Sequence, residues 1–160
     1  MRKILLIFFL LIATISFGLV KADSVLVIKS ESKLYLMKNG ILLKKYHVAF
    51  GANPKGHKQQ EGDERTPEGK YFLDYKKKNS SFYKAIHISY PNNEDKRRAK
   101  EKGVSPGGQI MIHGQKNDFG WLSFITQRFN WTDGCIAVSN DDMDEIWNAV
   151  DIGTPIEIKP

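Results

Sequence analysis

Alternating apolar and polar residues in the first third of the chain predict three β-strands. Residues 24–29 are rich in β-branched side chains, which favour extended backbone. Two further strand-like runs, 33–38 and 41–50, flank the dipeptide formed by Asn39 and Gly40. Asn-Gly between two such runs indicates a β-hairpin, because both turn positions need positive φ.

The remaining pattern predicts a single domain that is mainly β, with about three short helices and no internal repeat. A long polar connection at 51–69 leads into the later elements, and a loop of this length is often functional. The last helix is the clearest, because its apolar residues recur at the spacing of one buried face: Met143, Ile146, Trp147 and Val150. The other expected elements are strands at 70–75, 85–90, 109–113 and 154–159, a lysine-rich turn at 76–79, a helix at 93–102, and a short helix with an apolar face within 118–130.

The N-terminal segment has the composition of a secretory signal peptide. Two basic residues give a positive start, residues 4–12 are almost purely apolar, and weaker apolar residues continue to Val20. Val20 and Ala22 fit the positions that a signal peptidase recognises. We therefore expect export to the periplasm or cell envelope, with removal of residues 1–22 and a mature domain at 23–160. An uncleaved membrane anchor is the alternative.

Charge narrows the classes of partner. The formal net charge of the chain is +6, and removal of residues 1–22 would leave 21 basic against 18 acidic residues. That small excess suits an extracytoplasmic protein that meets anionic envelope polymers. It is too small to indicate nucleic acid, so we expect no nucleic-acid partner.

Cys135 is the only cysteine of the chain. An exported protein with one cysteine cannot form an internal disulfide, so its thiol is either free or bridged to another chain. In an oxidising compartment a free thiol is a liability unless it is used or buried. Composition leaves two interpretations open, a reactive nucleophile and a small buried apolar residue.

A cysteine nucleophile needs a base, and His113 is the best candidate among the four histidines. It ends an apolar run, and Gly114 after it allows another backbone or a ligand to approach closely. His47 and His87 lie inside strand-like runs and are expected to be structural. His57 lies in a polar loop and is expected to be solvated.

Gly134, directly before Cys135, suggests how an oxyanion could be stabilised. A tight turn at Asp133 and Gly134 would direct backbone N–H groups at the atom bonded to sulfur. Zinc binding is the competing use of cysteine and histidine, but one cysteine and scattered histidines lack the paired spacing of metal ligands. We therefore expect neither a metal nor a cofactor.

These residues resemble the motif of the L,D-transpeptidase (YkuD-type) catalytic domains of bacterial cell-wall enzymes. That motif is His-Gly, a spacer, Ser or Thr, any residue, Gly-Cys and an apolar residue. Residues 113–114 and 132–136 match it, and the resemblance continues upstream through 62–69 and 88–92 to cover nearly all of 23–159. It implies a mainly β domain of sandwich or barrel-like form, with the cysteine and histidine facing one groove.

The resemblance also implies roles for individual residues. Cys135 would be the nucleophile and His113 the general base, while backbone N–H groups at Asp133 and Gly134 would hold the oxyanion. Two positions depart from the family pattern. Many members carry His where this chain has Asp133 and Arg where it has Ala137, which leaves the binding of the acyl donor open.

Substrate binding is the least defined part of the expectation. Gly114, Thr132 and Arg65 are candidates, and Arg65 would grip the charged stem peptide together with Asp63 and Glu68. The alternative for the charged residues is a rigid Thr-Pro turn whose charges are simply solvated.

The resemblance implies acyl transfer on peptidoglycan stem peptides. Cys135 would attack the carbonyl of the third stem residue, a diamino acid, expel the terminal D-alanine, and pass the thioester to an amine acceptor. With water as acceptor the protein would be an L,D-carboxypeptidase, as is thought for some members of the single-domain exported branch. With a lysine-bearing lipoprotein it would attach or release that protein. Carbapenem-type β-lactams would be covalent inhibitors.

Two other classes stay open from the residues alone. One is a non-catalytic envelope-binding domain, in which Cys135 would be unreactive. The other is a thiol redox or metal protein, although the lack of a second cysteine argues against intramolecular redox cycling.

Overall fold

The computed structural model describes residues 20–160. The predicted signal peptide falls almost entirely on residues 1–19, so that prediction lies outside the described residues. Within 20–160, no helix combines the length and the apolar character that a membrane span requires.

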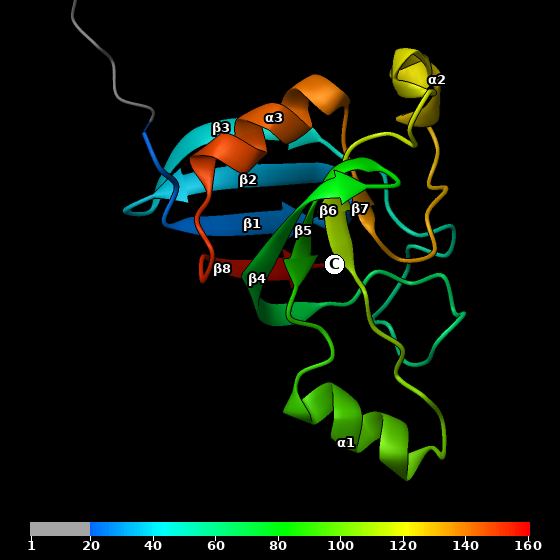
Figure 1. Ribbon diagram of the computed structural model, residues 1–160. Helices are drawn as coiled ribbons and strands as arrows, with labels where there is room; N and C mark the ends of the chain where they lie inside the picture. The colour runs from blue at the N-terminus through cyan, green and yellow to red at the C-terminus, as the bar shows by residue number, and fades with distance from the viewer. Residues whose placement is uncertain (1–19) are drawn as a thin grey trace, which may run out of the picture.

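Residues 20–160 contain eight strands, which form one sheet in the order β3-β2-β1-β8-β4-β5-β6-β7 (Figure 1). The same residues contain three short α-helices, which confirms the predicted mainly β class. The strands are β1 Ser24–Ile28, β2 Lys33–Lys38, β3 Ile41–His47, β4 Gly69–Ser80, β5 Tyr83–Ile88, β6 Met111–His113, β7 Ile136–Ala137 and β8 Pro155–Lys159. The helices are α1 Asn93–Glu101, α2 Ser123–Thr126 and α3 Asn140–Ala149, with 3-10 turns at Lys29–Glu31 and Gly120–Leu122.

The predicted hairpin at Asn39 and Gly40 is confirmed. Both residues have positive φ, at 51° and 75°, and they join β2 to the antiparallel β3. β3 ends at His47, earlier than the pattern predicts. The chain leaves β2 at this point because Ala49 exchanges two backbone hydrogen bonds with Ala137, at 2.9 and 2.8 Å.

The turn predicted at 76–79 is wrong, because β4 runs straight through these lysines to Ser80. The chain reverses at residues 81–82 instead, and Lys77 pairs with Ala85 across the hairpin. Lys76 shows how a lysine can be accommodated inside a β-strand that packs against a helix. Its ammonium group donates to the carbonyls of Trp147 and Val150, at 2.6 and 2.7 Å, at the C-terminal end of α3.

The core lies between the sheet and α3, which crosses one face of it in Figure 1. The expected stripe on α3 is confirmed: Met143, Ile146 and Val150 are fully buried, and Trp147 packs against the core. Alternate residues of β1 and β2 meet this cluster, which is the two-residue period of a half-buried strand. The apolar residues of the 118–130 segment do not join it. Leu122 is half-buried and the others are exposed around α2, with Trp121 71% exposed.

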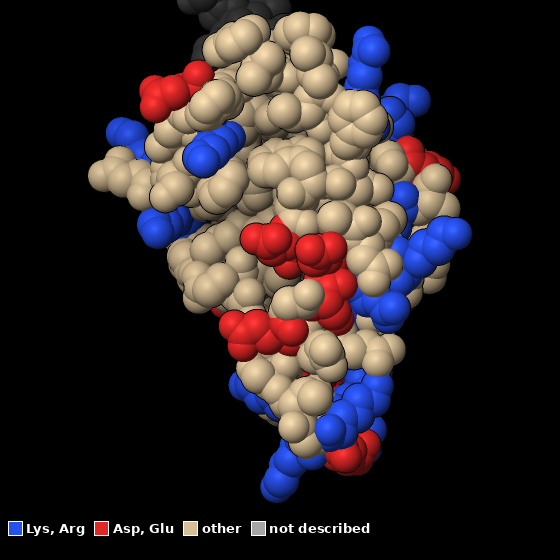
Figure 2. Space-filling model, turned by 90° about the vertical axis from the view of Figure 1, so that its right-hand side faces the viewer, with Lys and Arg blue, Asp and Glu red and all other residues tan. Residues whose placement is uncertain are grey.

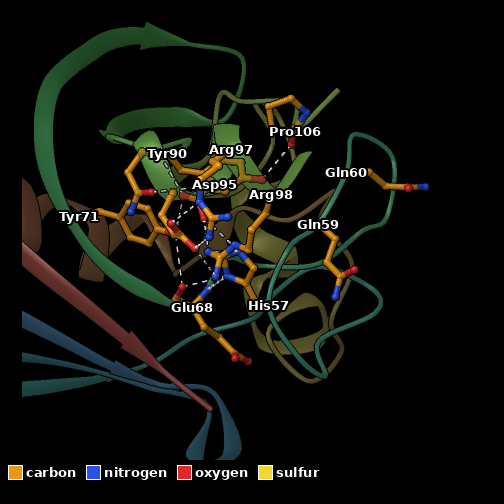
Figure 3. A network of polar contacts seen from close by, with 12 residues as sticks. His57, Gln59, Gln60, Glu68, Tyr71, Tyr90, Asp95, Arg97, Arg98 and Pro106 are labelled. Carbon is orange, nitrogen blue, oxygen red and sulfur yellow. Dashed lines mark hydrogen bonds and ion pairs between the residues drawn. The ribbon is translucent and has the colours of Figure 1, made fainter. Parts of the chain in front are cut away.

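Loop 51–69 is fixed to α1 by a polar network (Figure 3). Asp95 lies at its centre and accepts from Tyr71 Oη at 3.0 Å and Arg98 at 2.8 Å. His57 Nε2 lies 3.0 Å from the same carboxylate, and its ring is half-buried. The expectation that His57 is solvated is therefore wrong, because a carboxylate 38 positions away in the sequence folds back onto it.

Candidate active site

The pairing of β6 with β7 brings Cys135 and His113 together. The two strands are parallel, and Ile112 pairs with Ile136 and His113 with Ala137. Continuing this register places Cys135 opposite Met111, whose N–H lies 3.4 Å from Sγ. Side chains alternate along a strand, so Cys135 and His113 point to one face and their Cα atoms lie about 8 Å apart. Ile112 and Ile136 point to the other face and are fully buried.

A short turn holds the cysteine at the start of β7. Thr132 Oγ1 donates to the Cys135 carbonyl at 2.7 Å and accepts from the Gly134 N–H at 3.2 Å. Gly134 has a φ of 121°, a conformation that other residues adopt only with strain. A Cβ at this position would also lie 2.6 Å from the Arg65 carbonyl oxygen. The backbone of this turn therefore explains the threonine and the glycine of the Thr-x-Gly-Cys pattern.

The carboxylate of Asp63 holds loop 51–69 together. The Asp63 carboxylate accepts from three backbone N–H groups of its own loop, those of Gln59, Gln60 and Arg65, at 2.7–3.1 Å. It also pairs with the buried Lys58 ammonium group at 2.8 Å. Asp63 is thus an internal anchor of the loop, and its carboxylate is not free to grip a substrate.

His113 is oriented for proton transfer by its own backbone neighbour. Its Nδ1 lies 2.6 Å from the Gly114 carbonyl oxygen, and the ring is buried against the rings of Phe82 and Trp131, at 4.7 and 5.9 Å between centroids. A carbonyl can only accept, so Nδ1 carries the proton and Nε2 is the basic nitrogen of the neutral ring. Burial lowers the pKa of the imidazole, which favours this neutral form.

The electrostatics of the thiol also favour a neutral resting state. Burial raises the pKa of Cys135, the Met111 N–H lowers it, and the neighbouring Asp133 charge raises it again. The charge of Lys58 has the smallest effect and lowers this pKa. A thiol that rests in its neutral form needs a base before it can act as a nucleophile, and His113 is the histidine that lines the same cavity.

Both residues line one cavity of about 460 Å³, the size of a small-ligand site. The β4–β5 hairpin and the segment 131–133 both line it, and the rings of Phe82 and Trp131 lie 6.0 Å apart between centroids. The other residues that line it near Cys135 and His113 include Ala85, Gln109, Met111 and Thr132.

Loop 51–69 lies on the side of the molecule that Figure 2 turns toward the viewer, where acidic side chains gather at the centre and basic ones at the margins.

Three residues singled out in the sequence have other contacts than expected. The Gly134 N–H is already donated to Thr132, so it is not an oxyanion donor in this structure. The N–H groups of Asp133 and Cys135 have no hydrogen-bond partner among residues 20–160 and are the available donors. Gly114 lies outside the cavity lining and makes room for Asn140 Oδ1, which would lie 2.6 Å from a Cβ there. Arg65 also lies outside the lining and contacts the turn through its carbonyl.

The other positions singled out in the sequence differ in how far their side chains are buried. Thr132 and Asp133 line the cavity, Thr132 buried and Asp133 exposed. Ala137 is fully buried between His113 and Ala49, so a long charged side chain has no space there. Lys58 was missed in the sequence because a lysine in a polar loop predicts solvent exposure, and only the fold shows it paired with Asp63.

The fold is a mainly β domain in which one cysteine and one histidine line the same cavity. The sequence profile of the L,D-transpeptidase catalytic domain family, YkuD, matches residues 22–158, and the chain belongs to that family. An Escherichia coli (strain K12) protein named "Putative L,D-transpeptidase YafK" is 32% identical over 111 residues, which are 68% of this chain and 37% of that protein.

Solved structures share the fold. The helical cell shape determining protein Pgp2 from Campylobacter jejuni is 26% identical, with a TM-score of 0.63, over 85% of this chain and 47% of that chain. The L,D-transpeptidase LdtMt1 in complex with imipenem is 19% identical, with a TM-score of 0.53, over 84% of this chain and 57% of that chain. The chain therefore spans less than half the length of YafK and Pgp2.

Proposed function

We propose that this chain is a cysteine-dependent L,D-transpeptidase that acts on the stem peptides of peptidoglycan. The observation that carries the proposal is the β6–β7 register, which puts Cys135 and His113 on one face over a shared cavity. Membership of the L,D-transpeptidase family supports the reaction class.

In the first half-reaction, Nε2 of His113 takes the Cys135 proton and sulfur attacks the carbonyl carbon of the third stem residue, a diamino acid. The N–H groups of Cys135 and Asp133 would stabilise the tetrahedral oxyanion. The bond to the terminal D-alanine then breaks, its nitrogen leaves with the proton from His113, and a thioester remains.

In the second half-reaction, an amine attacks the thioester. His113 accepts a proton from the attacking nitrogen, the new amide bond forms, and the proton returns to the departing thiolate. The products are a cross-linked peptide and the free enzyme.

Water in place of the amine would make the protein an L,D-carboxypeptidase or amidase. Cys135 is partly exposed, so a water molecule can reach the thioester from the cavity. A lipoprotein lysine is a third acceptor, and with it the same thioester would attach that protein to the wall or release it.

We also propose that the domain works in the periplasm or cell envelope. The composition of residues 1–22 supports export and removal of that segment. The expected partners there are peptidoglycan stem peptides and, for the third acceptor, an envelope lipoprotein.

A carbapenem tests the nucleophile. The likeness in fold to LdtMt1, solved in complex with imipenem, supports the choice of imipenem as a probe. Intact-mass measurement should find one covalent adduct on the purified protein and none on Cys135→Ala. Persistence of the adduct in Cys135→Ala would overturn the assignment.

Muropeptide analysis tests the acceptor. Incubation with a tetrapeptide donor and an amine acceptor should give dimers joined between third residues. Release of tripeptide alone would assign the carboxypeptidase reaction instead, and no turnover with either acceptor would overturn the proposal.

A further inference from the structure

We infer that Lys77 and Lys116 form a carboxylate-binding subsite at the β4–β5 side of the catalytic cavity. The inference rests on the proposed function, because the carboxylate belongs to the acyl donor. The two lysines lie on different segments, and both line the cavity that contains Cys135 and His113.

Strand register places Lys77 on the face of the catalytic pair. Lys77 of β4 pairs with Ala85 of β5, and Ala85 pairs with His113 of β6. Directly paired residues point to the same side of a sheet, so Lys77 lies two strand spacings, about 10 Å, from His113 between Cα atoms. Ala85 lies between them and carries only a methyl group, which leaves space above the sheet for a ligand.

Lys116 approaches the same wall from the loop after β6. The next residue, Asn117, is bound to the β4–β5 turn through both of its amide atoms. Its Oδ1 accepts from the Tyr83 N–H at 2.8 Å, and its Nδ2 donates to the Ser80 carbonyl at 3.0 Å. These bonds hold the Lys116 backbone beside the hairpin that carries Lys77.

Among residues 20–160, the two lysines of this wall have no acidic side chain within ion-pair distance, and the Lys116 ammonium group lies 5.9 Å from the centroid of the exposed Phe119 ring. Lys84 of the next strand, in contrast, pairs with Asp144 at 2.6 Å. The half-buried rings of Phe82 and Trp131 line the same cavity and reduce its contact with water. A cation beside such a wall attracts an anion more strongly than a cation in open solvent does.

Asp133 makes the distribution of charge in the cavity asymmetric. It lines the cavity next to Cys135 and repels a carboxylate from the nucleophile's side. A peptide with a carboxylate near the scissile bond is therefore oriented with that carboxylate toward the lysines.

The donor offers two carboxylates of the same chemistry. One belongs to the terminal D-alanine. The other ends the side chain of the third residue when that residue is a diaminodicarboxylic acid. A lysine binds either as a point charge, so amidation of each in turn identifies the one that is bound.

The test compares KM and kcat for three donors: the free tetrapeptide, its C-terminal amide and its side-chain amide. In the wild-type protein, amidation of the bound carboxylate should raise KM about tenfold or more with little change in kcat. Lys77→Met and Lys116→Met should raise KM for the free donor and remove its advantage over the amide. Lys77→Arg should restore it.

Lys78→Met is the matched control, because Lys78 is an exposed neighbour outside this cavity and should behave as wild type. Equal KM values for the three donors in the wild type, or unchanged KM values in both lysine-to-methionine variants, would overturn the subsite. Imipenem labelling and turnover by the wild type would persist in that case. Loss of both in the wild type would instead reject the proposed function.

Discussion

Burial raises the pKa of the Cys135 thiol, and the adjacent Asp133 charge raises it further. Burial also lowers the pKa of the His113 imidazole. Both residues therefore favour their uncharged forms at rest, and in the proposed mechanism the thiolate forms as His113 accepts its proton. The resting protein is in this way protected from indiscriminate reaction of its single thiol.

Asp133→Asn should make Cys135 more reactive at lower pH. Removal of the carboxylate takes away a charge that disfavours the thiolate, so the thiol pKa should fall. The rate of iodoacetamide alkylation, measured from pH 6 to pH 10, should show its rise displaced to lower pH. Glu64→Gln, which removes an exposed carboxylate from the adjacent loop, is the control. Superimposable profiles for wild type and Asp133→Asn would contradict the electrostatic argument.

Between elements, loop 51–69 contacts the turn before β7. The Ala52 N–H donates to the Thr132 carbonyl at 3.0 Å, and the Gly51 N–H donates to Thr66 Oγ1 at 3.2 Å. Gly134 lies against the Arg65 carbonyl in the same layer. The loop thus packs against the turn that precedes Cys135 and is itself bound to α1 through His57 and Asp95.

Gly134→Ala should destabilise the protein more than Gly153→Ala does. Both glycines have positive φ, but a Cβ at Gly134 would meet the Arg65 carbonyl, whereas Gly153 has open space around it. Gly153→Ala should cost about 1 kcal/mol from conformation alone, and Gly134→Ala about 2 kcal/mol or more. Urea unfolding measures both free energies. Equal losses would show that the loop moves aside without cost, and Gly134→Ala should also lose imipenem labelling.

At the scale of the whole molecule, the strand order determines where the cavity lined by Cys135 and His113 lies. β6 and β7 are at the end of the sheet opposite β3, and segments from 51 to 137 converge there. The network around Asp95 in Figure 3 ties α1 and loop 51–69 to β4 and thus joins this end to the rest of the fold. Its hydrogen bonds lower the pKa of the Asp95 carboxyl to about 2 against the opposing effect of burial.

The Asp95 network should make global stability sensitive to acid. A carboxylate with a depressed folded-state pKa stabilises the fold above its unfolded value of 3.8, and this contribution is lost as the pH falls toward 2. The free energy of unfolding should fall by about 2 kcal/mol more in the wild type than in Asp95→Asn between pH 5 and pH 2. Urea titrations at several pH values measure this difference. Glu61→Gln, at an exposed loop carboxylate, should follow the wild type, and parallel curves for Asp95→Asn would refute the linkage.

Local pattern was sufficient wherever one element decides its own structure. Asn39 and Gly40 had to form a hairpin because few other residues accept positive φ at both positions. The stripe on α3 had to be buried because its apolar residues share one face. The motif around Cys135 and His113 was found for a similar reason, since each residue lies beside glycine at the edge of an apolar strand.

Charged residues were interpreted less well, because their partners lie far away in sequence. Lys76 was expected in a turn, but the carbonyl groups that it binds lie at the end of α3. His57 was expected in water, but it meets Asp95. Gly134 was expected to donate to the oxyanion, but its N–H is used by Thr132.

The sequence by itself determined the mainly β class, the hairpin and the last helix, and it singled out Cys135 and His113 as the candidate nucleophile and base, because periodicity, turn chemistry and the Gly-Cys motif are local properties. Only the tertiary structure decided that Lys77 and Lys116 line the same cavity as Cys135 and that Asp63 and Lys58 form an ion pair with each other. The physical reason is that burial and charge pairing depend on which strands become neighbours, and β4, β5, β6 and β7 are neighbours only in the folded sheet.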